Sequence, residues 1–322
     1  MLKYLNIHRS GLSGKVLQGC FLLISAVAVA QQPEHEFSVY GAGGLSTLRY
    51  TPSTGVRSEG TGGLLGIGYT WYYYKNWGVV TGIELSQFSA RTENITLEDR
   101  YKAIDADGAS FEFRSKVVNN SENQTVVMLQ IPFLLQYENM FGKNYGWYCM
   151  GGTKVCFPLK SAYRVSSSLT TSGYYEKEQW TYEEQTFAGF GRFSGNGDGK
   201  LHFKIVVLAS IETGMKWRLE EGLFLYGGIY CDYGVDNMLR NRKSNRLVEY
   251  DIHRLAEYNA GRSEAFRPNS ILTAKYANDN RLVYITEKAT LLSAGVKLKI
   301  TFGLGKANGA KRWKPGWKPT RR

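Results

Sequence analysis

The stretch Leu292-Ser293-Ala294-Gly295-Val296-Lys297-Leu298-Lys299-Ile300-Thr301-Phe302 alternates apolar residues with polar or small ones without a break. Successive side chains of a β-strand point to opposite faces, so this period of two predicts a strand with one apolar face. Val127–Tyr137 and the segment from Phe203 to Trp217 alternate in the same way. Pro132 lies within the former, where it predicts a bulge or a local break in pairing because proline has no N–H to donate.

Five further segments alternate similarly but contain more glycine: Phe37–Leu45, Gly63–Tyr73, Gly78–Phe88, Tyr145–Leu159 and Leu223–Tyr233. Together the segments predict an all-β fold of eight strands. Small residues recur at positions that the alternation places inside a closed sheet, as the narrow interior of an eight-stranded barrel requires. They include Ala42, Gly44, Gly66, Gly68, Gly82, Gly152, Gly214, Gly228 and Gly295.

The connections between these segments alternate strictly in length. The short ones are Tyr74–Trp77, Glu138–Asn144 and Arg218–Gly222, and the long polar ones are Ser46–Gly62, Ser89–Asn123, Lys160–His202 and Gly234–Thr290. Outer-membrane barrels have short periplasmic turns and long external loops. The sequence therefore predicts an eight-stranded antiparallel up-and-down transmembrane β-barrel with four long external loops. A soluble lipocalin-like ligand binder is the alternative, because soluble barrels also alternate in hydrophobicity.

Aromatic residues gather beside the short connections, among them Trp71, Trp77, Tyr137, Trp147 and Trp217. Trp and Tyr are enriched where a membrane meets water. Their positions predict an interface girdle at the short-turn end of the barrel. In a soluble barrel the same residues would need another role, such as lining the mouth of a ligand site.

The two ends of the chain differ from the rest in composition. Residues 1–30 combine early positive charge, an apolar run and the A-x-A site Ala28-Val29-Ala30, which predicts a removed signal peptide. Of the formal charge of +12, this segment contributes three positive charges and Lys306–Arg322 seven, which leaves +2 for residues 31–305. The basic balance therefore describes the ends and argues against nucleic acid as a partner. We expect residues 31–305 to form the barrel domain and residues 306–322 a basic periplasmic tail.

Three short stretches resemble the OmpA-like outer-membrane β-barrel proteins of Bacteroidetes: Ile131–Tyr137, Lys154–Tyr163 and Gly227–Asn237. The resemblance spans Phe37–Gly305 and implies location in the bacterial outer membrane, an eight-stranded barrel, and a role in envelope structure or surface contacts. The last strand also resembles a barrel-assembly signal that ends at Phe302, which implies the barrel-assembly machinery as a partner. Many OmpA-like proteins carry a peptidoglycan-binding domain after the barrel. Anchoring by such a domain is not implied here, because only the basic tail follows.

Alternation places seven charged residues inside the barrel or at its rims: Glu84, Lys154, Glu212, Lys216, Asp232, Lys297 and Lys299. An isolated ion in a poorly hydrated interior costs several kcal/mol, so a paired interior network is predicted. A static polar plug is favoured because side chains nearly fill an eight-stranded interior. A narrow gated channel for small solutes is the alternative, in which ion pairs exchange partners to open a water path. The sequence alone assigns no specific pair.

No catalytic centre is predicted. Of His35, His202 and His253, only His202 lies at an external strand end, and Ser210 and Glu212 lie too far along the same strand for a proton relay. We expect no enzyme activity, no cofactor and no metal. Removal of the signal leaves an odd number of cysteines, which predicts no disulfide framework: Cys149, Cys156 and Cys231.

The expected loops and tail suggest partners besides outer-membrane lipids. Tyr174–Tyr182 mixes aromatic and charged residues, which suits contact with a surface protein or glycan but equally packing of loop against loop. Asp105–Gly108 and Asn196–Gly199 are interpreted as turns rather than calcium loops. The tail Lys306–Arg322 suits an anionic headgroup or envelope polymer, with a solvated disordered tail as the alternative. A role as an accessory of a secretion system also stays open.

Overall fold

The computed structural model describes residues 34–141, 144–239, 245–278 and 281–304. The expected signal peptide and the tail Lys306–Arg322 lie outside the described residues, so both stay predictions. Within these ranges no helix is long and apolar enough to cross a membrane.

The described residues form thirteen strands and two short helices, so the prediction of eight strands was wrong in number. In chain order they are β1 (Glu34–Pro52), β2 (Val56–Glu59), β3 (Thr61–Tyr74), β4 (Trp77–Ile104), β5 (Ser110–Met140), β6 (Tyr145–Tyr175), β7 (Trp180–Tyr182), the 3-10 helix η1 (Thr186–Ala188), β8 (Gly191–Lys200), β9 (Val206–Glu220), β10 (Leu223–Gly234), α2 (Ile252–Asn259), β11 (Lys275–Asn278), β12 (Arg281–Tyr284) and β13 (Thr286–Leu304).

Eight of these strands pair in a cycle that we call the barrel. Antiparallel pairings lead from β13 to β1, β3, β4, β5, β6, β9 and β10, and from β10 back to β13. Strands that follow one another along the chain are therefore neighbours in the sheet. The predicted all-β, antiparallel architecture is confirmed, and all eight predicted segments fall within or largely within these strands.

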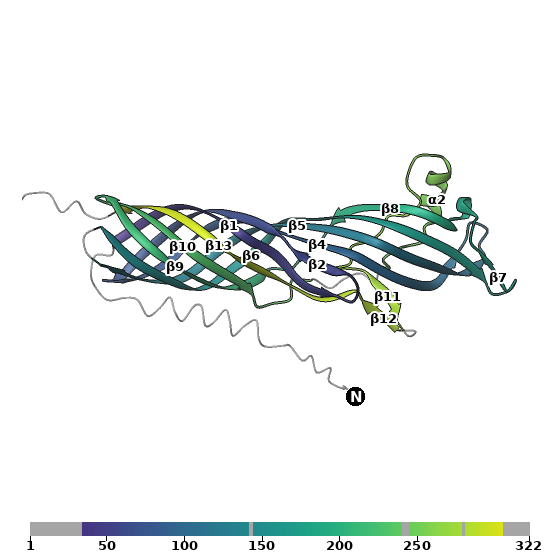
Figure 1. Ribbon diagram of the computed structural model, residues 1–322, viewed down its shortest axis with the longest axis horizontal. Coiled ribbons are helices and arrows are strands. Elements are labelled where there is room, and N and C mark those ends of the chain that lie inside the picture. The colour runs from purple at the N-terminus through teal and green to yellow at the C-terminus, as the bar shows by residue number, and fades with distance from the viewer. Residues whose placement is uncertain (1–33, 142–143, 240–244, 279–280, 305–322) are drawn as a thin grey trace, which may run out of the picture.

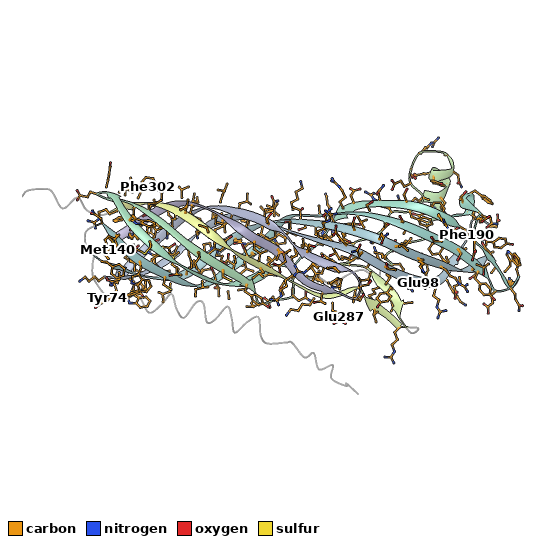
Figure 2. All side chains as sticks on the ribbon, viewed as in Figure 1. Tyr74, Glu98, Met140, Phe190, Glu287 and Phe302 are labelled. Atoms are coloured by element: carbon orange, nitrogen blue, oxygen red, sulfur yellow. The ribbon has the colours of Figure 1, made fainter. Side chains whose placement is uncertain are left out.

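The predicted long polar loops hold all five additional strands of the described chain, so they are not loops throughout. β4, β5 and β6 continue well past the barrel, and β8 pairs with the far part of β6 (Figure 1). We call this part the projection, comprising the described residues 89–125, 160–200, 235–239, 245–278 and 281–285. Figure 2 places Tyr74, Met140 and Phe302 at the short-turn end of the molecule and Phe190 near the opposite end. Asp105–Gly108 is a turn as predicted, whereas Asn196–Gly199 lies in β8.

Two asparagines shift the alternation within the projection. Asn94 and Asn119 have φ angles of 57° and 53° and lie where the register shifts, in β4 and β5 respectively. Before Asn94 the buried residues of β4 have even numbers, such as Ala90, and after it they have odd numbers, such as Ile95 and Leu97. Each shift is typical of a β-bulge. Unbroken alternation therefore predicts only the barrel parts of β4 and β5 and not their continuation into the projection.

The polarity of the two faces of the sheet reverses between barrel and projection. On the outer face of β4, Ile83 and Leu85 are exposed in the barrel, followed by polar Gln87. On the inner face, buried Glu84 is followed by buried Phe88 at the end of the barrel and by buried Ala90, Ile95 and Leu97 in the projection. The barrel is thus apolar outside and polar inside, whereas the projection has an apolar core.

Pro132 coincides with the local break in pairing that the sequence predicts. The β4–β5 ladder pairs Thr81 with Phe133 and Glu84 with Gln130, but the two positions between them are not paired. The β4–β5 register is the same before and after this gap. In the β5–β6 ladder, Pro132 stays paired with Lys154. The missing N–H of proline accounts for the gap, because it cannot donate to β4.

An apolar layer separates the barrel interior from the core of the projection. It comprises Leu48, Phe88, Val126, Met128, Cys156, Val206, Leu208 and Leu291, which are buried and belong to one hydrophobic cluster. That cluster continues into residues of the projection such as Phe113, Leu255 and Phe266. Phe203, predicted to lie in a strand, precedes β9 and joins the same cluster.

We expect Gly66→Ala to destabilise the barrel by about 1–3 kcal/mol, because its new methyl would overpack the interior. A Cβ on Gly66 would lie 2.5 Å from a ring carbon of Tyr40, which is itself buried. Gly43→Ala is the control, because its nearest atom would be 3.9 Å away. Denaturant unfolding of the chain in detergent micelles measures both, and equal stability of the two variants would contradict the packing.

Candidate functional site

A buried ion cluster joins three strands inside the barrel. Lys154 of β6 lies between two carboxylates, with its Nζ 2.9 Å from Oε2 of Glu84 on β4 and 2.9 Å from Oδ2 of Asp232 on β10. All three side chains are at most 2% exposed. The alternation of each strand points these three side chains inward. Closure of the barrel places their strands on different sides of one narrow interior, so the side chains meet there.

The same cluster extends to β9 and β13 through Lys297. Its Nζ lies 2.8 Å from Oε2 of Glu212 and 3.7 Å from Oε1 of Glu84, so Glu84 faces two cations. Tyr148 donates its hydroxyl to Oε1 of Glu212 at 2.9 Å. The ring of Tyr40 lies 4.1 Å from the Lys297 ammonium, a cation–π distance. One connected network therefore joins β4, β6, β9, β10 and β13.

A second ion cluster lies near the short-turn end. The Lys216 Nζ is 3.1 Å from Oε1 of Glu36 and 2.8 Å from Oε1 of Glu138. The hydroxyls of Tyr72 and Tyr226 each lie 2.9–3.2 Å from an oxygen of both carboxylates, so each shares its one hydrogen between them. The two carboxylates therefore share one cation and two hydroxyl donors.

Lys299 lies against aromatic rings instead of a carboxylate. Its Nζ is 4.1 Å from the ring centre of Tyr226 and 5.4 Å from that of Tyr148. Sδ of Met150 lies 4.0 Å away. Within the described part of the chain, no carboxylate lies at ion-pair distance from this ammonium.

The structure buries all seven charged residues that the sequence assigns to the interior, and it brings six of them into ion pairs. Glu36 and Glu138 also belong to the buried ion pairs, although they are not among the seven interior charges predicted from the sequence. The same parity reveals both, because Glu36 is in phase with inward Tyr40 on β1 and Glu138 with inward Gln136 on β5. They lie just outside the segments chosen as strands.

This arrangement suits a static connection between barrel strands better than conduction of ions through the barrel. Buried ions that are paired and hydrogen-bonded are tolerated, whereas separating them leaves uncompensated charge. The network lies on the barrel side of the apolar layer, and the side chains of that layer offer a passing ion no charged partner. Pair exchange alone would therefore not open a water path, because Phe88, Met128 and their neighbours would also have to move.

The histidines considered for catalysis do not meet an acid and a nucleophile. His202 is exposed and precedes β9, whereas Glu212 is committed to the interior network. Nδ1 of His35 contacts the hydroxyl of Tyr69, and His253 is exposed on α2. Among the described residues no cluster of His, Cys, Asp or Glu could hold a metal ion. The absence of enzyme activity stays a prediction.

A single buried carboxylate anchors the segment that covers the projection. Glu122 of β5 accepts hydrogen bonds from the Ser270 hydroxyl at 2.5 Å, the Ile271 N–H at 2.8 Å and the Gln124 amide at 2.9 Å. Tyr50 donates its hydroxyl to Oε1 of Gln124. No Lys or Arg pairs with Glu122 in the described part of the chain. Burial therefore raises the pKa of the Glu122 carboxyl to about 7, although its three hydrogen bonds oppose the shift.

We expect Lys154→Met to destabilise the barrel by about 3–5 kcal/mol, because two buried carboxylates lose their shared cation. The control is Lys116→Met, which removes an exposed 2.7 Å pair with Glu98 and should cost about 0.5 kcal/mol or less. Denaturant unfolding in micelles measures both. Adding Glu84→Gln and Asp232→Asn should recover much of the loss. An unchanged unfolding midpoint in Lys154→Met would contradict the role of the network.

We expect the Glu122 anchor to weaken as pH rises. A carboxyl whose pKa is raised by folding keeps its proton better when folded, so its stabilising effect is complete below about 4.5 and is lost as pH rises through about 7. The difference from Glu122→Gln should change by on the order of 3 kcal/mol over this window. Hydrogen exchange of the Ile271 amide, corrected for intrinsic rates, measures it. Glu98→Gln should keep the wild-type pH profile, and a similar profile in Glu122→Gln would exclude this anchor as the cause.

The comparisons with known proteins are sparse. No family model matches the chain, and no curated protein matches it. Two crystal structures of Ail, the attachment invasion locus protein of Yersinia pestis, match with 6% and 7% sequence identity and a TM-score of 0.26 each. Each covers 84% of this chain and 100% of Ail, and one holds the heparin analogue sucrose octasulfate. A TM-score this low carries no inference about fold or ligand, so the OmpA-like membership stays a prediction.

Proposed function

We propose that this chain is a non-enzymatic outer-membrane protein: an eight-stranded up-and-down transmembrane barrel that holds the projection outside the cell for surface contacts. The reversal of polarity between barrel and projection carries this proposal. A protein surrounded by water buries its apolar residues throughout. Here that pattern holds in the projection and is inverted in the barrel.

The outer surface of the barrel is a continuous apolar belt. Its exposed members come from all around the cycle and include Phe37, Val39, Leu65, Ile67, Ile83, Leu85, Phe133, Ile211, Ile229 and Val296. Exposed apolar surface of this extent would favour aggregation in water but suits contact with lipid tails. Trp77, Tyr74, Tyr145 and Trp217 are also exposed and flank the belt at the short turns, where interface aromatics are expected.

Two alternatives are less compatible with these contacts. A lipocalin-like binder needs an apolar cavity in a polar shell, whereas this barrel has buried ion pairs in an apolar shell. A narrow gated channel needs a polar path through both ends, whereas the apolar layer closes the interior toward the projection. The sealed interior therefore favours the structural or surface-contact role that the OmpA-like resemblance also implies.

The proposed partners follow from this placement. Outer-membrane lipids surround the belt, and the barrel-assembly machinery inserts the strands. A protein or glycan meets the projection, and an anionic envelope polymer contacts the tail Lys306–Arg322. Heat-modifiability is the direct test of the barrel: the membrane-bound product should change gel mobility only after boiling. A freely soluble product whose mobility does not change would overturn the proposal.

We expect Ile83→Arg to prevent stable insertion and Gln87→Arg to be tolerated. Both residues are exposed on the outer face of β4, but they lie on opposite sides of the polarity reversal. Arginine on the lipid face near the bilayer midplane costs about 2–4 kcal/mol and falls to about 0–1 near the interface. The amount of heat-modifiable protein in the membrane fraction measures the difference. A soluble protein would tolerate both substitutions equally, because both sites would face water.

A further inference from the structure

The far end of the projection contains a cavity of about 450 Å³. It lies between the β4–β5 turn, the β6–β7 turn, η1 and α2, beyond the last pairs of the β4–β5 hairpin. Phe190, which helps to line it, is labelled near this end in Figure 2. The cavity is thus as far from the apolar belt as the long strands allow.

Aromatic rings form much of the wall and rim. Tyr175 stacks on Phe111 with ring centres 5.1 Å apart, and Tyr182 meets Tyr175 edge-on at 5.4 Å. Phe187, which lines the cavity, is 68% exposed, and Trp180 on β7 is 62% exposed. These rings offer apolar and π surface to a ligand and keep several faces uncovered.

Three carboxylates line the same cavity. Asp105 caps its own turn, since Oδ1 accepts the N–H groups of Asp107 and Ala109, and Oδ2 accepts the Tyr175 hydroxyl at 2.8 Å. Oε2 of Glu178 accepts the Tyr182 hydroxyl at 2.8 Å. These bonds hold two carboxylates against two aromatic rings in a fixed geometry, and Asp107 is exposed beside them.

The cavity lacks basic residues, unlike the flanks of the projection. No Lys, Arg or His of the described chain lines it. On the flanks, half-buried Glu93 pairs with Arg91 at 2.6 Å and exposed Glu98 with Lys116 at 2.7 Å. Besides Glu178, the stretch from Tyr174 to Glu184 adds three glutamates and one basic residue, Lys177. The described residues that line the cavity therefore include three carboxylates and no basic side chain, which favours a cationic ligand.

We propose that this cavity binds a lysine or arginine side chain from a basic segment of a partner protein. A cation there would meet carboxylates and aromatic faces together, and both attract Arg and Lys. The exposed rings of Phe187 and Trp180 extend the contact surface beyond one side chain, which suits a peptide segment rather than a small free cation. A polyanionic glycan would be repelled. The inference rests on the proposed surface role and specifies its partner chemistry.

The test uses residues 31–322 in detergent micelles and a fluorescent hepta-arginine peptide as the probe, with fluorescence anisotropy as the readout. The double variant Asp107→Asn/Glu178→Gln removes two negative charges, and the Gln amide oxygen can still accept the Tyr182 hydroxyl. Its matched control, Glu93→Gln/Glu98→Gln, removes two charges from the flank. We expect at least a tenfold loss of affinity in the cavity variant and less than a twofold loss in the control.

Phe187→Ser tests the aromatic contribution without changing charge and should weaken peptide binding at least threefold. Equal losses in the two charge variants, unchanged binding in Phe187→Ser, or tighter binding of hepta-glutamate than of hepta-arginine would overturn the inference. Heat-modifiability of each variant is measured in parallel. If the chain is heat-modifiable but does not bind the peptide, the peptide site is rejected and the membrane barrel is not. If the chain is soluble and not heat-modifiable but binds the peptide, the membrane barrel is rejected and the peptide site is not.

Discussion

The constraint on which this structure depends is the pairing of every barrel strand with two neighbours. Because β13 pairs with both β1 and β10, the cycle leaves none of its eight strands as a free edge. In a lipid environment this closure is required, since unpaired backbone N–H and C=O groups there find no water. Closure also turns every second side chain toward a narrow interior. The residues of that interior are therefore limited to those that can be buried without a large loss of stability.

The interior network is a consequence of this geometry. Several inward positions are charged, and a buried charge without a partner is costly. Lys299 is stabilised by aromatic rings, and the other inward lysines by carboxylates. Lys154 and Lys297 contact two carboxylates each, and Lys216 does so at the other end. Glycines leave the space for these long side chains. A Cβ on Gly66 would meet the Tyr40 ring that contacts Lys297.

Sequence periodicity was sufficient for the eight barrel strands, their short turns and the inward side of the charged residues, because these depend on local alternation. It did not reveal the projection, because the shifts at Asn94 and Asn119 interrupt the period and the apolar face there changes sides. It also could not assign ion pairs. Lys154 is 70 residues from Glu84 and 78 from Asp232 in sequence, so their contact depends on register between strands that are not neighbours.

The barrel and the projection share continuous strands although the polarity of their faces is opposite. The same strands β4, β5 and β6 pass through the apolar layer without interruption, so the projection is an extension of the barrel wall rather than a tethered domain. Their ladder hydrogen bonds hold the far end of the projection at a set distance from the barrel. Rigid strands position a binding site more precisely than flexible loops do. A fixed cluster of carboxylates and aromatic rings at that end therefore presents a preorganised surface, which reduces the entropy lost when a partner binds.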